Sequence, residues 1–167
     1  MNLNKLILFL VAILAILIGG FTYINSQNFD LYTSANKVKY YEVLDDKEGV
    51  DIYYYYMSTC GYCNSIKDQV TDLYLATEET EGVSMKLVDL KLNSNSAGWA
   101  QDEEYDPALV DMTDVENIKI TGTPAMIYVV DGEVVNYQAG GGVFEVMEQA
   151  NSEFDLGLEF DPSKYGE

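Results

Sequence analysis

The chain has 167 residues, of which 48% are hydrophobic and 22% charged, which is enough for one domain and its core. It carries 28 acidic residues and nine lysines, with no arginine or histidine, so the formal charge is −19 at pH 7. This charge repels polyanions and excludes nucleic-acid binding. The absence of histidine excludes a Cys–His dyad, a Ser–His–Asp triad and a histidine-ligated metal.

Residues 6–24 form an uncharged apolar run, about as long as the roughly 20 residues that span a bilayer. Lys5 and the terminal amine precede it, and the positive-inside rule places that end in the cytoplasm and the acidic remainder outside the cell membrane. We expect residues 1–28 to be an uncleaved single-pass anchor rather than a cleaved signal peptide, because the run is long and the Gly19–Phe21 region fits a cleavage site poorly. In both cases the following domain is exported to a compartment where disulfides persist.

Apolar residues at helical spacing predict a helix from Asp30 to about Gly49. The run from Val50 to Met57, which includes four consecutive tyrosines, predicts a strand buried on both faces. A second helix is expected from Asn64 to about Thr80, and a strand over residues 83–90. We expect the two strands to be parallel, since a helix joins them.

Residues 91–106 are polar and acidic and have no clear periodicity. Loops of this length are usually functional or mobile. Trp99, the single tryptophan, is a candidate substrate anchor, or it holds the loop on the body of the domain; both interpretations are open. The later elements expected are a short helix over 108–117 after Pro107, a strand over 125–130, a hairpin turn at Asp131–Gly132, an edge strand over 133–138, a helix over 143–154 and a frayed tail from Leu156.

The segment Cys60-Gly61-Tyr62-Cys63 contains the only two cysteines. A strand-to-helix junction places Cys60 over a helix N-terminus, where unpaired N–H groups and the helix dipole favour an anion. Such positions lower a thiol pKa from about 8.5 to roughly 3.5–7.5. Cys63 lies one turn further on, close enough to form a disulfide. The pattern predicts a thiol–disulfide exchange site, and two cysteines are too few for the usual ligands of a structural zinc.

Together with Thr121-Gly122-Thr123-Pro124, this segment makes residues 50–154 resemble the thioredoxin superfamily. The resemblance implies an α/β, thioredoxin-like fold, a central mixed sheet flanked by helices, over residues 29–157, with a tail at 158–167. It also implies that Cys60 is the nucleophile and Cys63 the resolving cysteine, that Pro124 is a cis-proline beside them, and that no metal or cofactor is used beyond the redox-active disulfide. The Thr123 backbone would pair with an extended substrate segment. Tyr62 and Trp99 are further candidate substrate contacts.

The sequence departs from thioredoxin at one position beneath the cysteines. Thioredoxin has a buried carboxylate six residues before its first cysteine, and here that position is Tyr54. A carboxylate that deprotonates Cys63 must therefore come from elsewhere, Asp51 and Asp89 being weak candidates. Small membrane-anchored thioredoxin-like proteins of Gram-positive bacteria, including bacteriocin transport accessory proteins, are similar to this chain.

These observations predict a membrane-tethered, extracytoplasmic thiol–disulfide oxidoreductase that exchanges disulfides with exported proteins and with a membrane electron donor or acceptor. They leave its direction open between oxidase, reductase and isomerase. An alternative is a non-catalytic accessory protein of an export or bacteriocin system. In that case Cys60 and Cys63 form a locked disulfide, and the acidic surface or the Trp99 loop binds an exporter or a cationic peptide.

Overall fold

The computed structural model describes residues 10, 11, 13, 14, 29–100 and 109–166. The chain divides into two compact units, residues 1–30 and 31–167. In the first unit, residues 10, 11, 13 and 14 are helical. The rest of the expected anchor, residues 1–28, lies outside the described residues. Within the described part of the chain, no helix is both long enough and apolar enough to cross a membrane.

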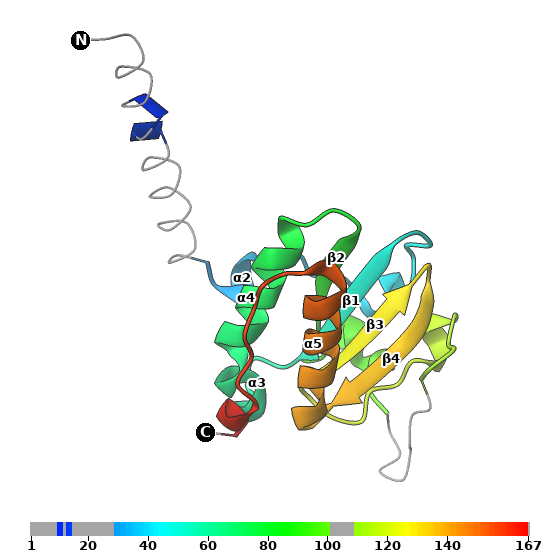
Figure 1. The fold of residues 1–167 in the computed structure, drawn as a ribbon. Coiled ribbons are helices and arrows are strands. Elements are labelled where there is room, and N and C mark those ends of the chain that lie inside the picture. Colours follow the sequence, from blue (N-terminus) through cyan, green and yellow to red (C-terminus); the bar gives the residue numbers. More distant parts are fainter. Residues whose placement is uncertain (1–9, 12, 15–28, 101–108, 167) are drawn as a thin grey trace, which may run out of the picture. The chain divides into compact units, whose positions relative to one another are not determined.

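The second unit is built on a four-stranded mixed sheet (Figure 1). Its strands are β1 (Val50–Tyr56), β2 (Val83–Asp89), β3 (Ala125–Val130) and β4 (Glu133–Ala139), in the order β2-β1-β3-β4. β1 and β2 are parallel, whereas β3 is antiparallel to both β1 and β4. The predicted strands, the parallel pair and the hairpin are therefore confirmed.

Among the described residues of this unit, the α-helices are α2 (Leu31–Ser34), α3 (Gly61–Ser65), α4 (Lys67–Glu78) and α5 (Val143–Phe154). α4 packs on β2, and α5 packs on β3 and β4, so both helices cover the same face (Figure 1). The predicted helix over 64–80 is divided at Ile66 into α3 and α4, whereas the predicted helix over 143–154 is confirmed. The 3₁₀ turn η1 (Tyr40–Glu42) contacts both η2 (Asn93–Gly98) and η3 (Val115–Asn117).

The tyrosine run is buried on both faces of the sheet, as predicted. Side chains alternate along a strand, so Tyr53 and Tyr55 point to one face and Tyr54 and Tyr56 to the other. Tyr53 and Tyr55 belong to a core cluster on the η1–η3 side of the sheet, with Val43, Leu44, Ile118, Ile120, Ala125, Ile127 and Val129 among its members. Each of the four tyrosines is at most 1% exposed.

The predicted helix from Asp30 to Gly49 is wrong. The segment forms α2, then a short extended stretch, then η1. Lys37 makes a parallel bridge to Leu87 on the outer edge of β2. The Leu87 N–H donates to Asn36 O at 2.9 Å and the Val38 N–H donates to Leu87 O at 3.0 Å. Backbone groups of Asn36 and Val38 are therefore hydrogen-bonded to the edge of β2, whereas in a continuous helix they would have been paired within the helix.

The predicted helix over 108–117 is also wrong for the residues described, which begin at Leu109. The Asp111 N–H donates to Val134 O at 2.8 Å, and the Val134 N–H donates to Met112 O at 2.9 Å. Asp111 has a φ of 69°, in the left-handed region, which interrupts a right-handed helix. Only the single turn η3 remains near the end of the predicted range.

The frayed tail expected from Leu156 is not found in residues 156–166. The Asn151 side chain makes two hydrogen bonds with the Leu158 backbone, each 2.9 Å long. The Gln69 side chain makes a second such pair with the Asp161 backbone. Polar side chains of α5 and α4 thus hold this segment, which sequence periodicity does not show.

Candidate active site

The Cys60–Cys63 disulfide lies where β1 gives way to α3. Cys60 is the N-cap residue of α3, with extended backbone angles of −77° and 119°, and Cys63 is in its first turn. The two Cα atoms are 5.3 Å apart. Cys60 is partly exposed, whereas Cys63 is fully buried. An external thiol or thiolate therefore meets the Cys60 sulfur first, as expected for the attacking cysteine.

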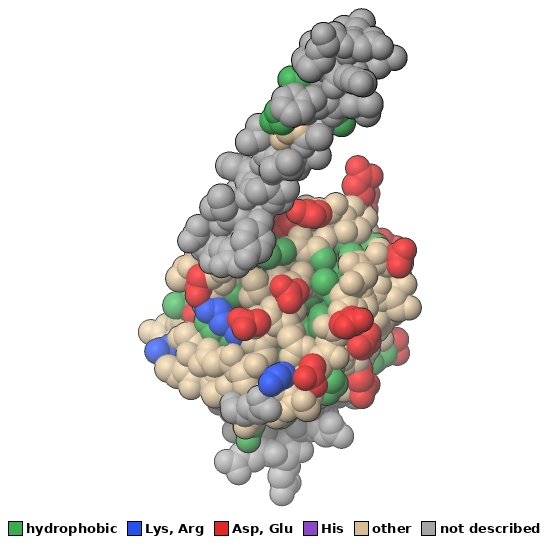
Figure 2. Space-filling view, turned by 60° about the vertical axis from the view of Figure 1, so that its left-hand side comes forward, with side chains coloured by type: hydrophobic (Ala, Val, Ile, Leu, Met, Phe, Trp, Pro, Cys, Tyr) green, Lys and Arg blue, Asp and Glu red, His purple; other side chains and the backbone are tan. Residues whose placement is uncertain are grey.

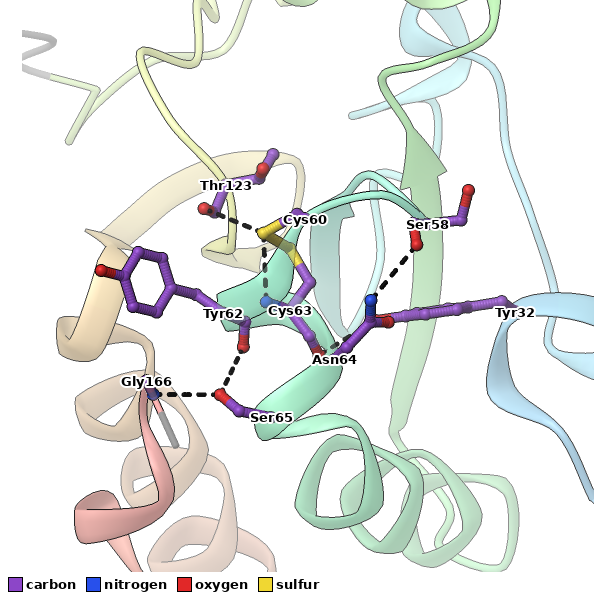
Figure 3. Close-up of a disulfide and its surroundings, with 9 residues drawn as sticks. All are labelled: Tyr32, Ser58, Cys60, Tyr62, Cys63, Asn64, Ser65, Thr123 and Gly166. Atoms are coloured by element: carbon purple, nitrogen blue, oxygen red, sulfur yellow. Dashed lines mark hydrogen bonds between the residues drawn. A yellow bond between two sulfur atoms is a disulfide. The ribbon is translucent and has the colours of Figure 1, made fainter.

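The backbone at the start of α3 is arranged around the Cys60 sulfur. The Cys63 N–H donates to Cys60 Sγ at 3.1 Å. A backbone N–H aimed at this sulfur stabilises the thiolate that forms when the disulfide is reduced. On the other side, Cys60 Sγ lies 3.4 Å from Thr123 O (Figure 3). A disulfide sulfur carries no hydrogen, so this is a contact here, and it becomes a possible S–H···O hydrogen bond only in the thiol form.

Pro124 lies directly after Thr123, and the Thr123–Pro124 peptide bond is cis, as expected. β3 begins at the next residue, Ala125, which pairs with Tyr55 of β1. The Gly140 N–H donates to Pro124 O at 2.8 Å. The structure therefore brings Thr123 and Pro124 to the cysteine pair. The pairing of the Thr123 backbone with a substrate remains a prediction.

Aromatic side chains lie behind Cys63. One of them, Tyr32, is not among the site residues that the sequence predicts. The Tyr32 hydroxyl donates to Cys63 O at 3.0 Å, and the Tyr32 ring stacks on Tyr56 with centroids 4.4 Å apart. Tyr54 stacks on Tyr56 in turn, at 5.9 Å. Burial, and secondarily the neighbouring Tyr32, raise the pKa of Tyr54 well above its ordinary value. Tyr54 thus stays protonated and, unlike the carboxylate of thioredoxin, offers no base for Cys63.

The two candidate carboxylates have different positions. Asp51 is at the start of β1 and lies about 17 Å along the strand from Tyr56, at about 3.3 Å per residue. Its oxygens accept from Ser84 Oγ, Lys86 Nζ and the Tyr53 hydroxyl. This placement removes Asp51 as a base for Cys63. Asp89 pairs with Tyr56 at the cysteine end of the sheet and accepts from the Lys91 N–H at 3.0 Å; its role remains a prediction.

Tyr62 and Trp99 occupy different environments. Tyr62 lies between the cysteines and remains 52% exposed, with its ring stacked on Tyr165. Trp99 makes a parallel bridge with Ile120 and packs against the core cluster of the η1–η3 side. This contact holds the described part of the segment, which ends at Ala100, on the domain. A substrate contact of either residue remains a prediction.

One face of the molecule carries many acidic side chains. Figure 2 shows Asp and Glu side chains spread over the visible face, with few lysines between them. Within the described residues, no group of three or more His, Cys, Asp or Glu side chains is arranged to hold a metal ion. The reactive groups that the structure places at this site are the two sulfurs of Cys60 and Cys63.

No protein-family model and no curated protein sequence matches the chain. Solved structures do. Mitochondrial thioredoxin 3 from Saccharomyces cerevisiae, in the oxidised form, aligns with a TM-score of 0.51 and 15% identity, over 72% of this chain and 97% of that one. Thioredoxin f2 from Chlamydomonas reinhardtii aligns with a TM-score of 0.50 and 14% identity, over 72% and 96%. At these identities the similarity shows the fold, which is thioredoxin-like.

Proposed function

We propose that this chain is a membrane-tethered, extracytoplasmic thiol–disulfide oxidoreductase. The observation that carries the proposal is a partly exposed Cys60 paired with a buried Cys63 on a thioredoxin-like fold, with the Cys63 N–H aimed at Cys60 Sγ at 3.1 Å. Substrates are the thiols and disulfides of exported proteins, and a membrane electron donor or acceptor restores the resting form.

The geometry supports the following exchange for a reducing turnover. The Cys60 thiolate attacks one sulfur of a substrate disulfide, so that a Cys60–substrate disulfide forms, the substrate disulfide breaks and the released sulfur takes up a proton. Cys63 then loses its proton and attacks Cys60 Sγ. The mixed disulfide breaks, and the substrate leaves as a dithiol while Cys60 and Cys63 become a disulfide. The chain gives up two electrons, and the reverse sequence oxidises a substrate.

The proposed location depends on the sequence of residues 1–28. An uncharged run at 6–24 with Lys5 before it supports a single-pass anchor with a cytoplasmic N-terminus. We propose the catalytic domain at residues 29–157, outside the membrane. The similarity to small anchored thioredoxin-like proteins of Gram-positive bacteria, including bacteriocin transport accessory proteins, agrees with this location.

The test is the equilibrium reduction potential of the Cys60/Cys63 couple in the full-length chain, held in detergent micelles and equilibrated with thiol–disulfide buffers. Potentials in the superfamily run from about −270 mV to about −120 mV. A value near the upper end would make the protein an oxidant of exported proteins, and a value near the lower end a reductant supplied by a membrane donor.

A disulfide that does not exchange at all would refute the proposal. That result would favour the non-catalytic alternative, in which the acidic surface, 28 acidic residues against nine lysines, binds an exporter or a cationic peptide. A very slow reaction of reduced Cys60 with iodoacetamide at neutral pH would point the same way, because the thiolate is the reacting species.

A further inference from the structure

The helix that carries the cysteines is weak by itself. α3 has five residues, Gly61–Ser65, and ends at Ile66, where φ is −103° and ψ is 3°. Helices this short do not form in isolation, and glycine at position 61 lowers the helix propensity further. The direction of the Cys63 N–H, and with it the stabilisation of the Cys60 thiolate, therefore depends on groups that hold α3 from outside.

On the buried side, the group is the Tyr32 hydroxyl, which donates to the carbonyl of the buried Cys63. On the exposed side, the groups come from the C-terminal strap, which we define as residues 158–166. The Tyr165 ring stacks on Tyr62 with centroids 4.7 Å apart and an angle of 9° between the planes. The strap therefore packs against Tyr62, one of the two residues between the cysteines.

A second link joins Gly166 of the strap to Ser65 and Tyr62 of α3 (Figure 3). The Gly166 N–H donates to Ser65 Oγ at 3.1 Å, and the Ser65 hydroxyl donates to Tyr62 O at 3.0 Å. This chain of two hydrogen bonds connects the strap to the backbone of α3. Ring and backbone of Tyr62 are therefore both held by the same segment.

The strap is fixed at several points before it reaches α3. Asn151 of α5 holds Leu158, and Gln69 of α4 holds Asp161. Tyr165 also crosses the glycine turn after β4. A Cβ on Gly140 would lie 3.1 Å from the Tyr165 hydroxyl, and one on Gly141 would lie 3.6 Å from its ring. Tyr165 therefore packs closely against the backbone of both glycines.

The strap should contribute more to holding the first turn of α3 in the reduced form than in the oxidised form. In the oxidised form the disulfide itself ties Cys60 to Cys63, one turn apart, and restrains the first turn of α3. In the reduced form this bond is gone and only non-covalent contacts keep the turn. We propose that Tyr165 is a positioning residue that preferentially stabilises the reduced dithiol by stacking on Tyr62. This inference rests on the proposed function.

The test equilibrates the full-length chain, in detergent micelles, with reduced and oxidised glutathione. Two glutathione molecules reduce the Cys60–Cys63 disulfide and leave as one glutathione disulfide, so thiols and electrons balance. Aromatic pairs change equilibria by about two- to tenfold. We expect Tyr165→Ala to lower the equilibrium constant for reduction about threefold, which is about 14 mV toward more negative potential. Tyr165→Phe keeps the stacked ring and should match the unmodified chain.

Two further variants separate positioning from general destabilisation. Tyr41→Ala removes a tyrosine that is 54% exposed on η1, outside the strap, and should leave the equilibrium constant unchanged. Ser65→Ala cuts the second link without touching Tyr165 and should shift the constant in the same direction as Tyr165→Ala. It also provides the test if Tyr165→Ala does not fold.

An unchanged constant in Tyr165→Ala and Ser65→Ala would overturn the inference while leaving the proposed function intact. An equal shift in Tyr41→Ala would overturn it as well, because the effect would then be general. If the unmodified chain does not exchange with glutathione, the proposed function fails, and the inference fails with it. The rate of Cys60 alkylation by iodoacetamide at pH 7 in the reduced chain should fall in Tyr165→Ala and not in Tyr41→Ala.

Discussion

Removing the hydroxyl of Tyr53 and that of Tyr55, two tyrosines of β1, should change the stability of the fold in opposite directions. Tyr53 and Tyr55 lie on the same face of the strand and both are 0% exposed. The Tyr53 hydroxyl donates to Asp51 Oδ2 at 3.2 Å and accepts from the Leu44 N–H at 3.3 Å. The Tyr55 hydroxyl has no hydrogen-bond partner among the described residues. We therefore expect Tyr53→Phe to destabilise the fold and Tyr55→Phe to stabilise it.

The magnitudes follow from these partners. A hydrogen bond to a charged group contributes about 1.5–3 kcal/mol. Asp51 keeps Ser84 and Lys86 when the Tyr53 hydroxyl is removed, so the loss in Tyr53→Phe should be about 1–2 kcal/mol. A buried hydroxyl without a partner costs about 1–3 kcal/mol on mutational scales. Tyr55→Phe should therefore gain about 1–2 kcal/mol, and the two variants should differ by about 2–4 kcal/mol.

The assay is urea unfolding of the full-length chains in the oxidised form, followed by near-ultraviolet circular dichroism. The glutathione equilibrium of both variants should equal that of the unmodified chain, because both side chains belong to the core cluster on the η1–η3 side and neither hydroxyl is hydrogen-bonded to α3. A loss of stability in Tyr55→Phe would show that its hydroxyl has a partner, such as a buried water, and would refute the reasoning. So would a Tyr53→Phe variant as stable as the unmodified chain.

Three further outcomes are expected. Cys63→Ser should accumulate mixed disulfides through Cys60 on non-reducing gels, whereas Cys60→Ser should accumulate almost none; equal trapping would contradict the assigned roles. Gly98→Ala should lower the free energy of unfolding by about 1–3 kcal/mol, because its Cβ would lie 2.5 Å from the Tyr40 ring. That ring is fixed by its hydroxyl, which donates to Ile118 O. Gly122→Ala, with open space around its Cβ, is the matched control in the same unfolding assay. Burial, and then the nearby Asp51, raise the pKa of Tyr53 from 10.0 to about 12, so the unfolded chain loses this proton first as pH rises. Stability from Tyr53 should thus be complete below pH 10 and fall by up to about 1.4 kcal/mol per pH unit between pH 10 and 12, and a Tyr53→Phe variant with an equally steep alkaline loss would argue against this cause.

Much of the fold could be predicted because its signals are local. The four strands have β-branched or aromatic runs bounded by turn residues, and Asp131–Gly132 joins β3 to β4 where a hairpin was predicted. α5 begins directly after the three glycines. Cys60, Cys63 and Pro124 come together as predicted, since each belongs to a short motif at the end of a strand or the start of one.

The errors arose where a distant partner decided the local structure. Residues 30–49 have apolar side chains at helical spacing, yet Asn36 and Val38 bond to Leu87, about fifty positions away. The same holds for the site. Tyr32 and Tyr165 are ordinary aromatic residues in their own surroundings, and their contacts with Cys63 and Tyr62 exist only in the folded chain. Periodicity carries no information about such pairs.

The chain reverses direction at the end of α5 and returns toward α3. The number of residues in the returning segment therefore decides whether Tyr165 reaches Tyr62. Asp155 adopts a left-handed conformation, with φ at 51°, and turns the backbone back toward α3. From the bond between Asp161 and Gln69, four residues lead to Tyr165. Three of these residues, Pro162–Lys164, form a 3₁₀ turn, in which each residue advances the chain by about 2 Å and rotates it by about 120°. Adding or removing one residue in this stretch would therefore carry the ring off Tyr62, even if every side chain that touches the cysteines were kept.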